Sequence, residues 1–245
     1  MSAIARLMQL GRGARLVVVS PHLDDAVFSA GATLAEAAAS GIDVVNLTVF
    51  AGVPDSNGAP GSWDRQARFS SDGEAARRRR LEDEAGCRAI GVEPRWLPYR
   101  DDQYSDDRSE IWNELEPALA EADAILVPGF PLQHPDHVWV TSLVWDARAR
   151  LPQIGFYVEQ PYAEAVLFRR GWLPERGGGA AELFGESIVW SRSRPRLVHW
   201  WQKQKGFAAY SSQLKAMTRP RARVLIRVGV YDMRRRGEWL GLPVR

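Results

Sequence analysis

Residues 15–29 read RLVVVSPHLDDAVFS, and this stretch joins an apolar run to a helix-like segment through a short polar turn. The run Leu16–Val19 is continuous and mostly β-branched, which is typical of a strand buried on both faces of a parallel sheet. Pro21 ends that strand. Apolar residues then recur at helical spacing, at Val27, Ala30, Leu34 and Ala37. Gly41 follows as a C-cap, so the stretch predicts a strand, a turn and a helix in direct succession.

The alternation of strand and helix continues to about residue 160. Further strands are predicted at residues 44–50, 96–99, 124–127 and 154–158, with helices around 81–91, 111–122 and 140–147. Such alternation predicts an α/β fold, namely a Rossmann-like, doubly wound and mostly parallel sheet with helices on both faces. In the common strand order the fourth strand lies beside the first. The segments that follow these two strands then meet at the topological switch point, where ligands bind.

The rest of the chain is less regular. Residues 51–73 are rich in Gly, Pro, Ser and Asp without periodicity, which is typical of a functional loop. Toward the C-terminus we expect a flexible turn at 174–181, an edge strand at 187–190, one helix over 197–217 and a basic tail at 219–236. Interleaved apolar residues in the tail favour a solvated strand edge over a nucleic-acid surface. We expect one domain over residues 1–245, with an extension from about 172 to 245 packed on the core.

Two short segments contain three of the four histidines, each beside an aspartate. His22 and Asp25 follow the first predicted strand, and a helix that begins there places both side chains on one side of its first turn. With His137, which follows the fourth strand, they form a His, Asp, His set of the kind that catalytic zinc uses while one position stays open to water. Asp24 is left unligated beside the ion, where it can take a proton from water.

These residues also have structural interpretations. An aspartate pair after a strand is often an acidic helix N-terminus, and Asp136 is well placed to cap the helix that follows residue 134. A single histidine near a loop is usually a hydrogen-bonded surface residue. Two separate clusters of His and Asp, each after a predicted strand, favour the metal site over these alternatives.

Composition excludes several classes of protein. Lys+Arg 32 against Asp+Glu 30 gives a net charge of +2, which argues against nucleic acid as the partner. Cys87 can form no internal disulfide and is expected to be a buried thiol. Residues 1–13 lack a signal-peptide core, and no stretch approaches about 18 apolar residues. We therefore expect a cytoplasmic protein without a membrane partner; a homo-oligomer remains compatible with the sequence.

The motifs SPHLDD at 20–25 and HPDH at 134–137 resemble the paired signatures of the LmbE-like, or PIG-L, zinc N-deacetylases. That family removes acetyl groups from N-acetyl amino sugars and related glycoconjugates. The likeness extends over most of the chain, including residues 89–92, 157–162 and 210–213. It implies one zinc ion per chain, bound by His22, Asp25 and His137, with Asp24 as the general base. His134 would stabilise the oxyanion or protonate the leaving amine, and Asp136 would orient His134.

The resemblance also suggests a substrate site. Arg79 or Arg80 and Asp101 match positions near the sugar, although structural roles are the stronger interpretation of an arginine on a helix and an aspartate in a turn. Trp63, in the 51–73 segment, is a candidate for stacking against a sugar or aromatic aglycone.

The chain departs from the common family pattern in two places. The motif often reads His-Pro-Asp-Asp-Glu, whereas here Leu23 and Ala26 replace Pro and Glu; neither position supplies a proposed ligand or base. Some relatives have a tyrosine shortly before the second motif that assists the tetrahedral intermediate. Here Leu132 and Gln133 precede that motif, so the assistance is absent or comes from elsewhere.

The leading hypothesis is therefore zinc-dependent hydrolysis of the acetamide of a small N-acetyl amino sugar or glycoconjugate. One alternative is a sugar- and metal-binding protein of the same fold without turnover, and another is a different amide hydrolase of secondary metabolism. A phosphoesterase is a further alternative, but such enzymes favour two ions about 4 Å apart and a denser set of carboxylates.

Overall fold

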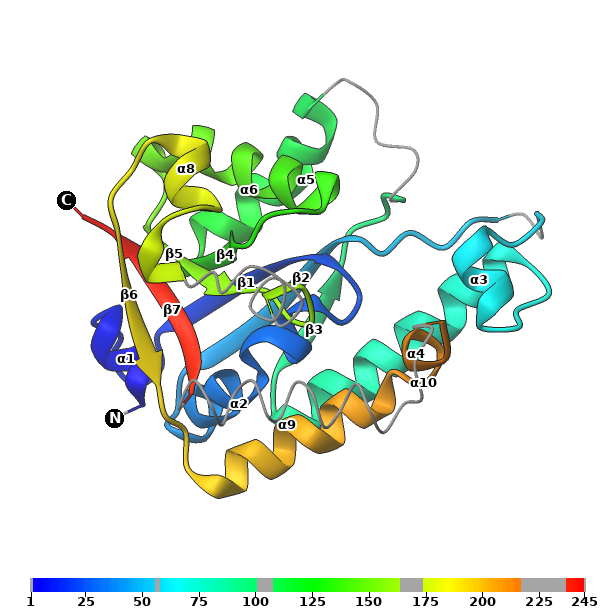
Figure 1. The fold of residues 1–245 in the computed structure, drawn as a ribbon, viewed down its shortest axis with the longest axis horizontal. Helices are drawn as coiled ribbons and strands as arrows, with labels where there is room; N and C mark the ends of the chain where they lie inside the picture. Colours follow the sequence, from blue (N-terminus) through cyan, green and yellow to red (C-terminus); the bar gives the residue numbers. More distant parts are fainter. Residues whose placement is uncertain (1, 56–57, 101–107, 164–173, 217–236, 245) are drawn as a thin grey trace.

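A computed structural model of the chain describes residues 2–55, 58–100, 108–163, 174–216 and 237–244. Within these residues a 7-stranded sheet has the order β3-β2-β1-β4-β5-β7-β6 (Figure 1). The strands are β1 (Arg15–His22), β2 (Asp43–Phe50), β3 (Glu93–Trp96), β4 (Ala124–Phe130), β5 (Gln153–Val158), β6 (Ile188–Ser193) and β7 (Glu238–Pro243). β1 lies between β2 and β4, which is the common strand order on which the expected meeting of the two histidine segments depended. The pairs among β1 to β5 are parallel, whereas β7 pairs antiparallel with β5 and β6.

Helices cover both faces of the sheet (Figure 1), which confirms the predicted fold class. One face carries α1 (Ala3–Leu7), α2 (Asp25–Ala39), α4 (Asp72–Ile90) and α9 (Leu197–Ala209); the other carries α5 (Arg108–Ala120), α6 (Pro135–Asp146) and α8 (Ala180–Phe184). The shorter elements are α3 (Ser62–Gln66), α10 (Ser211–Ala216) and the 3-10 turns η1 (Arg148–Arg150) and η2 (Pro174–Arg176). Among the described residues, no helix is long and apolar enough to cross a membrane.

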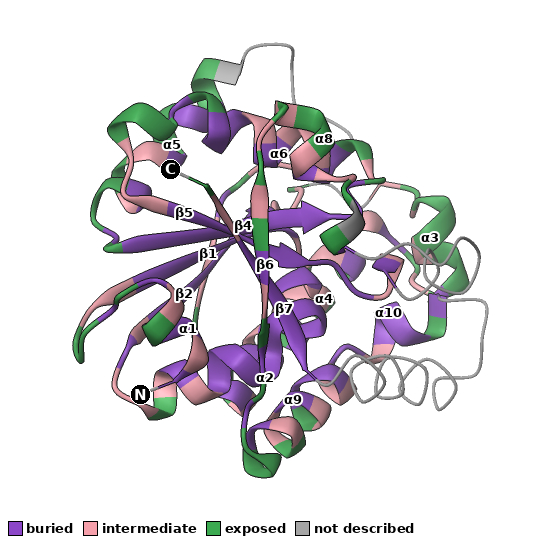
Figure 2. Cartoon of the chain, turned by 60° about the vertical axis from the view of Figure 1, so that its left-hand side comes forward, coloured by how far each residue is buried: buried purple, intermediate pink, exposed green. Residues whose placement is uncertain are grey.

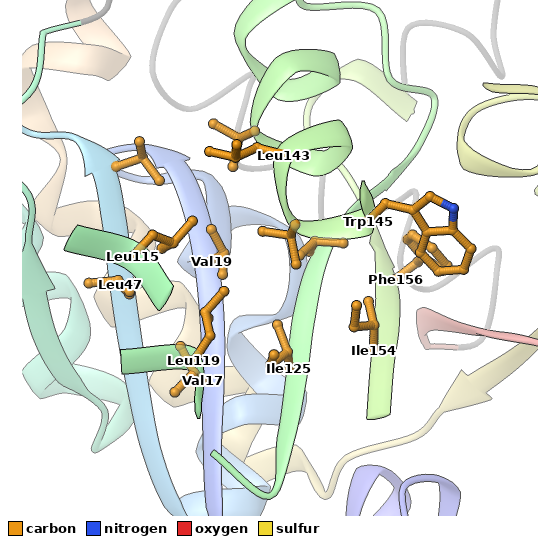
Figure 3. Packing of buried hydrophobic residues seen from close by; sticks show 14 of the residues in the cluster. Val17, Val19, Leu47, Leu115, Leu119, Ile125, Leu143, Trp145, Ile154 and Phe156 are labelled. Atoms are coloured by element: carbon orange, nitrogen blue, oxygen red, sulfur yellow. The ribbon is translucent and has the colours of Figure 1, made fainter. Parts of the chain in front are cut away.

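The continuous apolar run of β1 is explained by two hydrophobic cores, one on each face of the sheet. Val17 and Val19 belong to the cluster under α5 and α6, whereas Leu16 and Val18 belong to the cluster under α2. Successive side chains of a strand point to opposite faces, so a strand covered on both faces needs apolar residues at every position. Figure 2 shows the central strands buried along their length, and Figure 3 shows Val17 and Val19 within the first cluster.

Several predicted boundaries are wrong. The third strand begins at Glu93 and ends at Trp96, so it contains Pro94 rather than Pro98. It is an edge strand, where a missing N–H donor is tolerated. The aperiodic 51–73 segment contains α3, and the expected turn at 174–181 contains η2 and the start of α8. The edge strand predicted at 187–190 is confirmed as β6, while the basic tail at 219–236 lies outside the described residues.

The helix predicted over 197–217 is divided into α9 and α10 at Tyr210. Tyr210 is buried, and its hydroxyl donates to Asp83 Oδ1 at 2.8 Å, while Trp96 Nε1 donates to Asp83 Oδ2 at 2.8 Å. Gly86 makes room for the tyrosine, because a Cβ atom there would lie 2.5 Å from its ring. Asp83 on α4 thus ties the α9–α10 junction to the edge of the sheet.

Asp83 provides a prediction about stability and pH. Burial raises the pKa of Asp83 to about 6, although the Trp96 and Tyr210 donors oppose this shift. The folded state therefore retains a proton that the unfolded chain releases near pH 4, so the contribution of Asp83 to stability falls as pH rises from about 4 to 6 and then stays constant. Asp83→Asn mimics the protonated group, and we expect its unfolding free energy relative to wild type to rise by about 3 kcal/mol over this range. Urea titrations at pH 4 to 7 test this; parallel curves would contradict it.

Candidate metal centre

The two histidine segments meet at one edge of the sheet. His22 is the last residue of β1, and Asp25 is the first residue of α2. His137 lies in the first turn of α6, which follows β4. Because β1 and β4 are parallel neighbours, their carboxyl ends lie side by side, and the side chains that follow them converge.

Three of the converging atoms have the spacing of metal ligands. His22 Nδ1 lies 3.2 Å from His137 Nε2, His137 Nε2 lies 3.3 Å from Asp25 Oδ2, and His22 Nδ1 lies 3.5 Å from Asp25 Oδ2. A tetrahedral ion with metal–ligand distances of about 2.0–2.2 Å separates its ligand atoms by about 3.3–3.6 Å. The donor set and its spacing therefore fit zinc. His134 also has a ring nitrogen within 4.8 Å of those of His22 and His137.

Each of the two ligand-like imidazoles has a carboxylate on its other nitrogen. Asp136 Oδ2 lies 2.8 Å from His22 Nε2, and Glu159 Oε2 lies 2.5 Å from His137 Nδ1. Carboxylates in this position orient metal-bound histidines and make them more basic. We expected Asp136 to orient His134, but its carboxylate is 3.8 Å from His134 Nδ1. The structure therefore corrects this prediction, because Asp136 contacts His22 instead.

The start of α6 also differs from expectation. His134, rather than Asp136, is the N-cap, and its Nδ1 accepts a hydrogen bond from the Asp136 backbone N–H at 3.3 Å. In the neutral imidazole the remaining proton then resides on Nε2, which leaves that atom as a donor. Burial and the neighbouring His22 and His137 imidazoles lower the pKa of His134, which favours this neutral form over the protonated one.

The electrostatics of the centre favour positive charge. Burial disfavours the charged form of both imidazoles, yet their carboxylate partners raise the pKa of His22 to about 9 and that of His137 to about 10. Burial acts against the ionised form of Asp25 too, but His137 and His22 hold the pKa of that carboxyl well below its usual range. In the metal-free chain protons supply the positive charge that a divalent cation supplies in the loaded protein.

Asp24 occupies a strained position next to these residues. Its φ is 121°, and although it is the N-cap of α2, its side chain makes no capping hydrogen bond. Burial and the Asp25 carboxylate raise the pKa of Asp24 well above its ordinary value. Because its side chain makes no capping hydrogen bond, the alternative role of Asp24 as a side-chain helix cap is excluded. The carboxylate instead lines the cavity beside the candidate metal centre.

The cavity next to the centre has a volume of about 590 Å³. Its walls include His22, Asp24, Asp25 and His134, together with Phe50, Trp63, Arg79 and Tyr162. Arg80 is not among the lining residues; its Nε donates to the Ala51 carbonyl at 2.6 Å, and its guanidinium lies over the Trp96 ring. Of the two candidate arginines the structure thus places only Arg79 at the cavity, where it forms an ion pair with Asp64. Asp101 lies outside the described residues.

Residues 159–162 form a third segment of the site, to which the sequence analysis assigned no role. Glu159 reaches His137, and the Tyr162 ring lies 5.4 Å from that of His137 and 6.3 Å from that of His134. The segment follows β5, the neighbour of β4 in the sheet. The signal available in the sequence was the position of this segment directly after a predicted strand, because residues that follow adjacent parallel strands share one edge of the sheet.

Comparison with known proteins identifies the family and agrees with the observed fold. The sequence profile of the PIG-L family, described as GlcNAc-PI de-N-acetylase, matches residues 17–148, whereas no curated protein sequence matches the chain. Among solved structures, the A40926 pseudoaglycone deacetylase Dbv21 is similar to this chain, with a TM-score of 0.76 and 26% identity. A zinc-inhibited form of the teicoplanin deacetylase Orf2 is also similar, with a TM-score of 0.78 and 22% identity. Each of these two similarities covers 95% of this chain and 98% of the compared chain. N,N'-diacetylchitobiose deacetylase from Pyrococcus horikoshii has a TM-score of 0.51 and 18% identity over 85% of this chain and 76% of its own. Because the family profile spans more than half of the sequence, the chain belongs to the PIG-L family of de-N-acetylases.

Proposed function

We propose that this protein is a zinc-dependent N-deacetylase that hydrolyses the acetamide of an N-acetyl amino sugar or glycoconjugate. The observation that carries the proposal is the triangle of His22 Nδ1, Asp25 Oδ2 and His137 Nε2, with the Asp24 carboxylate beside it at the wall of the cavity. A zinc ion held by these three residues supplies Lewis acidity toward the acetyl carbonyl and makes water more acidic. Family membership and the deacetylase neighbours support this chemistry.

The protein's own groups then move the protons. Asp24 accepts a proton from the attacking water as the new C–O bond forms, and returns it to the nitrogen as the C–N bond breaks, which yields acetate and a free amine. His134 donates a hydrogen bond from Nε2 to the oxygen on which negative charge develops. The Asp136 backbone amide bonded to His134 Nδ1 keeps the imidazole in the tautomer that this role needs.

Removal of the metal tests the function directly. We expect acetate release from N-acetylglucosaminyl conjugates to be lost after treatment with a chelator and restored by one equivalent of zinc, because the proposed ligand set holds a single ion. Acetate is quantified together with metal content. Equal rates before and after chelation would contradict the proposal, and two ions per chain would favour the phosphoesterase alternative.

Trp63 tests where the sugar lies. Trp63 is 41% exposed and lines the cavity, and its Nε1 donates to Gln213 Oε1 at 2.7 Å. We expect Trp63→Ala to raise KM by about 10-fold with little change in kcat, because the ring contributes binding surface but lies outside the ligand triangle. Trp201, which is 70% exposed and does not line this cavity, provides the matched control Trp201→Ala. An unchanged KM in Trp63→Ala would remove Trp63 from the substrate site.

A further inference from the structure

Glu159 connects the metal centre to the loop that precedes the second histidine motif. It follows β5 directly and is 1% exposed. Its carboxylate is shared between two donors: Oε2 lies 2.5 Å from His137 Nδ1, and Oε1 accepts from the Leu132 backbone N–H at 2.8 Å. Its own backbone N–H donates to the Phe130 carbonyl at 2.6 Å. One residue thus contacts both a proposed ligand and the end of β4.

We propose that Glu159 is a positioning residue that makes His137 a metal ligand through Nε2 and sets the affinity of the centre for zinc; the proposal rests on the metal site of the proposed function. A carboxylate on Nδ1 retains the proton there and leaves the Nε2 lone pair free. It also makes the imidazole a stronger donor toward a cation, because charge on the ring is compensated by the carboxylate.

The second hydrogen bond extends this role to His134. Leu132 has a φ of 52°, a backbone conformation that a side-chain-bearing residue rarely adopts, and its N–H is held by Glu159 Oε1. This turn leads directly to His134, the N-cap of α6. Glu159 therefore fixes the position of His134 relative to His137, although it lies more than twenty residues further along the chain.

The surroundings of Glu159 distinguish it from a structural carboxylate. Within the described part of the chain its ionic partner is His137, and no lysine or arginine pairs with it. Glu238 is the natural comparison, because it is buried like Glu159. Its carboxylate accepts hydrogen bonds from the backbone N–H groups of Ala32 and Thr33, but its charge is balanced by Lys203, whose Nζ lies 2.7 Å away. A buried carboxylate balanced only by an imidazole is suited to a site that a cation completes.

The test measures zinc affinity rather than turnover. Zinc dissociation constants are determined by competition with a chromophoric chelator for wild type, Glu159→Gln and Glu238→Gln, with melting temperatures of the metal-free proteins. In Glu159→Gln the amide oxygen replaces only one of the two acceptors and is less basic, so we expect zinc to bind about 10- to 100-fold more weakly. Glu238→Gln is expected to lower the melting temperature and to leave the zinc dissociation constant unchanged.

Nitrogen-15 NMR of the zinc-loaded wild type is a second measurement that does not depend on any variant. We expect His137 to carry a proton on Nδ1 and metal on Nε2. A zinc dissociation constant of Glu159→Gln within twofold of wild type, or metal on Nδ1, overturns the proposal. If zinc binds Glu159→Gln more weakly as expected but the wild type releases no acetate, the role of Glu159 is supported and the deacetylase function is rejected. If the wild type binds no zinc, both proposals are rejected.

Discussion

Asp24→Asn is expected to lower kcat for acetate release by about 100- to 10,000-fold, with zinc content still one ion per chain. General-base catalysis contributes a factor of this size, and asparagine preserves the shape of the side chain while it removes the proton acceptor. Asp24 makes no capping hydrogen bond that the substitution would break. Because the loss falls on kcat with KM nearly unchanged, steady-state kinetics separate it from a binding defect.

The stability of the same variant provides an independent measurement. Burial and the adjacent Asp25 disfavour the ionised Asp24 in the metal-free chain, so the neutral side chain is expected to raise the melting temperature of chelator-treated protein. Asp25→Asn is the matched variant at the neighbouring carboxylate, and it should lose zinc instead. An Asp24→Asn protein with wild-type kcat would remove Asp24 from the mechanism.

His137→Ala is expected to abolish zinc binding and, unlike His22→Ala, to destabilise the metal-free protein strongly. His137 is fully buried, and its loss leaves the Glu159 carboxylate without its ionic partner. Removal of one member of a buried ion pair costs about 3–5 kcal/mol of unfolding free energy. The His22 side chain is 20% exposed, and its partner Asp136 also lies 3.8 Å from His134 Nδ1, so a smaller cost of about 1–2 kcal/mol is expected.

Both histidine variants are compared by zinc titration and by urea unfolding in the presence of a chelator. Loss of zinc from both, with unequal loss of stability, is the expected pattern. Tight zinc binding by either variant would contradict the proposed ligand set. Equal stabilities would instead show that Glu159 finds another partner when His137 is absent.

The contacts of the candidate metal centre show why the sequence brought some of its residues together and not others. His22, Asp25 and His137 lie in motifs that follow two strongly apolar strands, and parallel strands direct such segments to one edge of the sheet. Arg80 and Arg79 are adjacent on α4, yet only Arg79 lines the cavity, because successive helix residues point about 100° apart. Helical spacing alone could not decide which of the two faces the site.

The amino-acid sequence by itself determined the α/β class and the position of each histidine motif directly after an apolar strand. Together with the common strand order of such sheets, this predicted that the two motifs converge. Those features depend on the periodicity of apolar residues and on polar residues at strand ends, both of which are local. The tertiary structure alone decided that Asp136 contacts His22, that Glu159 contacts His137, and that β7 enters the sheet between β5 and β6. These are contacts between segments far apart in the chain, and they are fixed by strand order and side-chain direction, which no local pattern encodes.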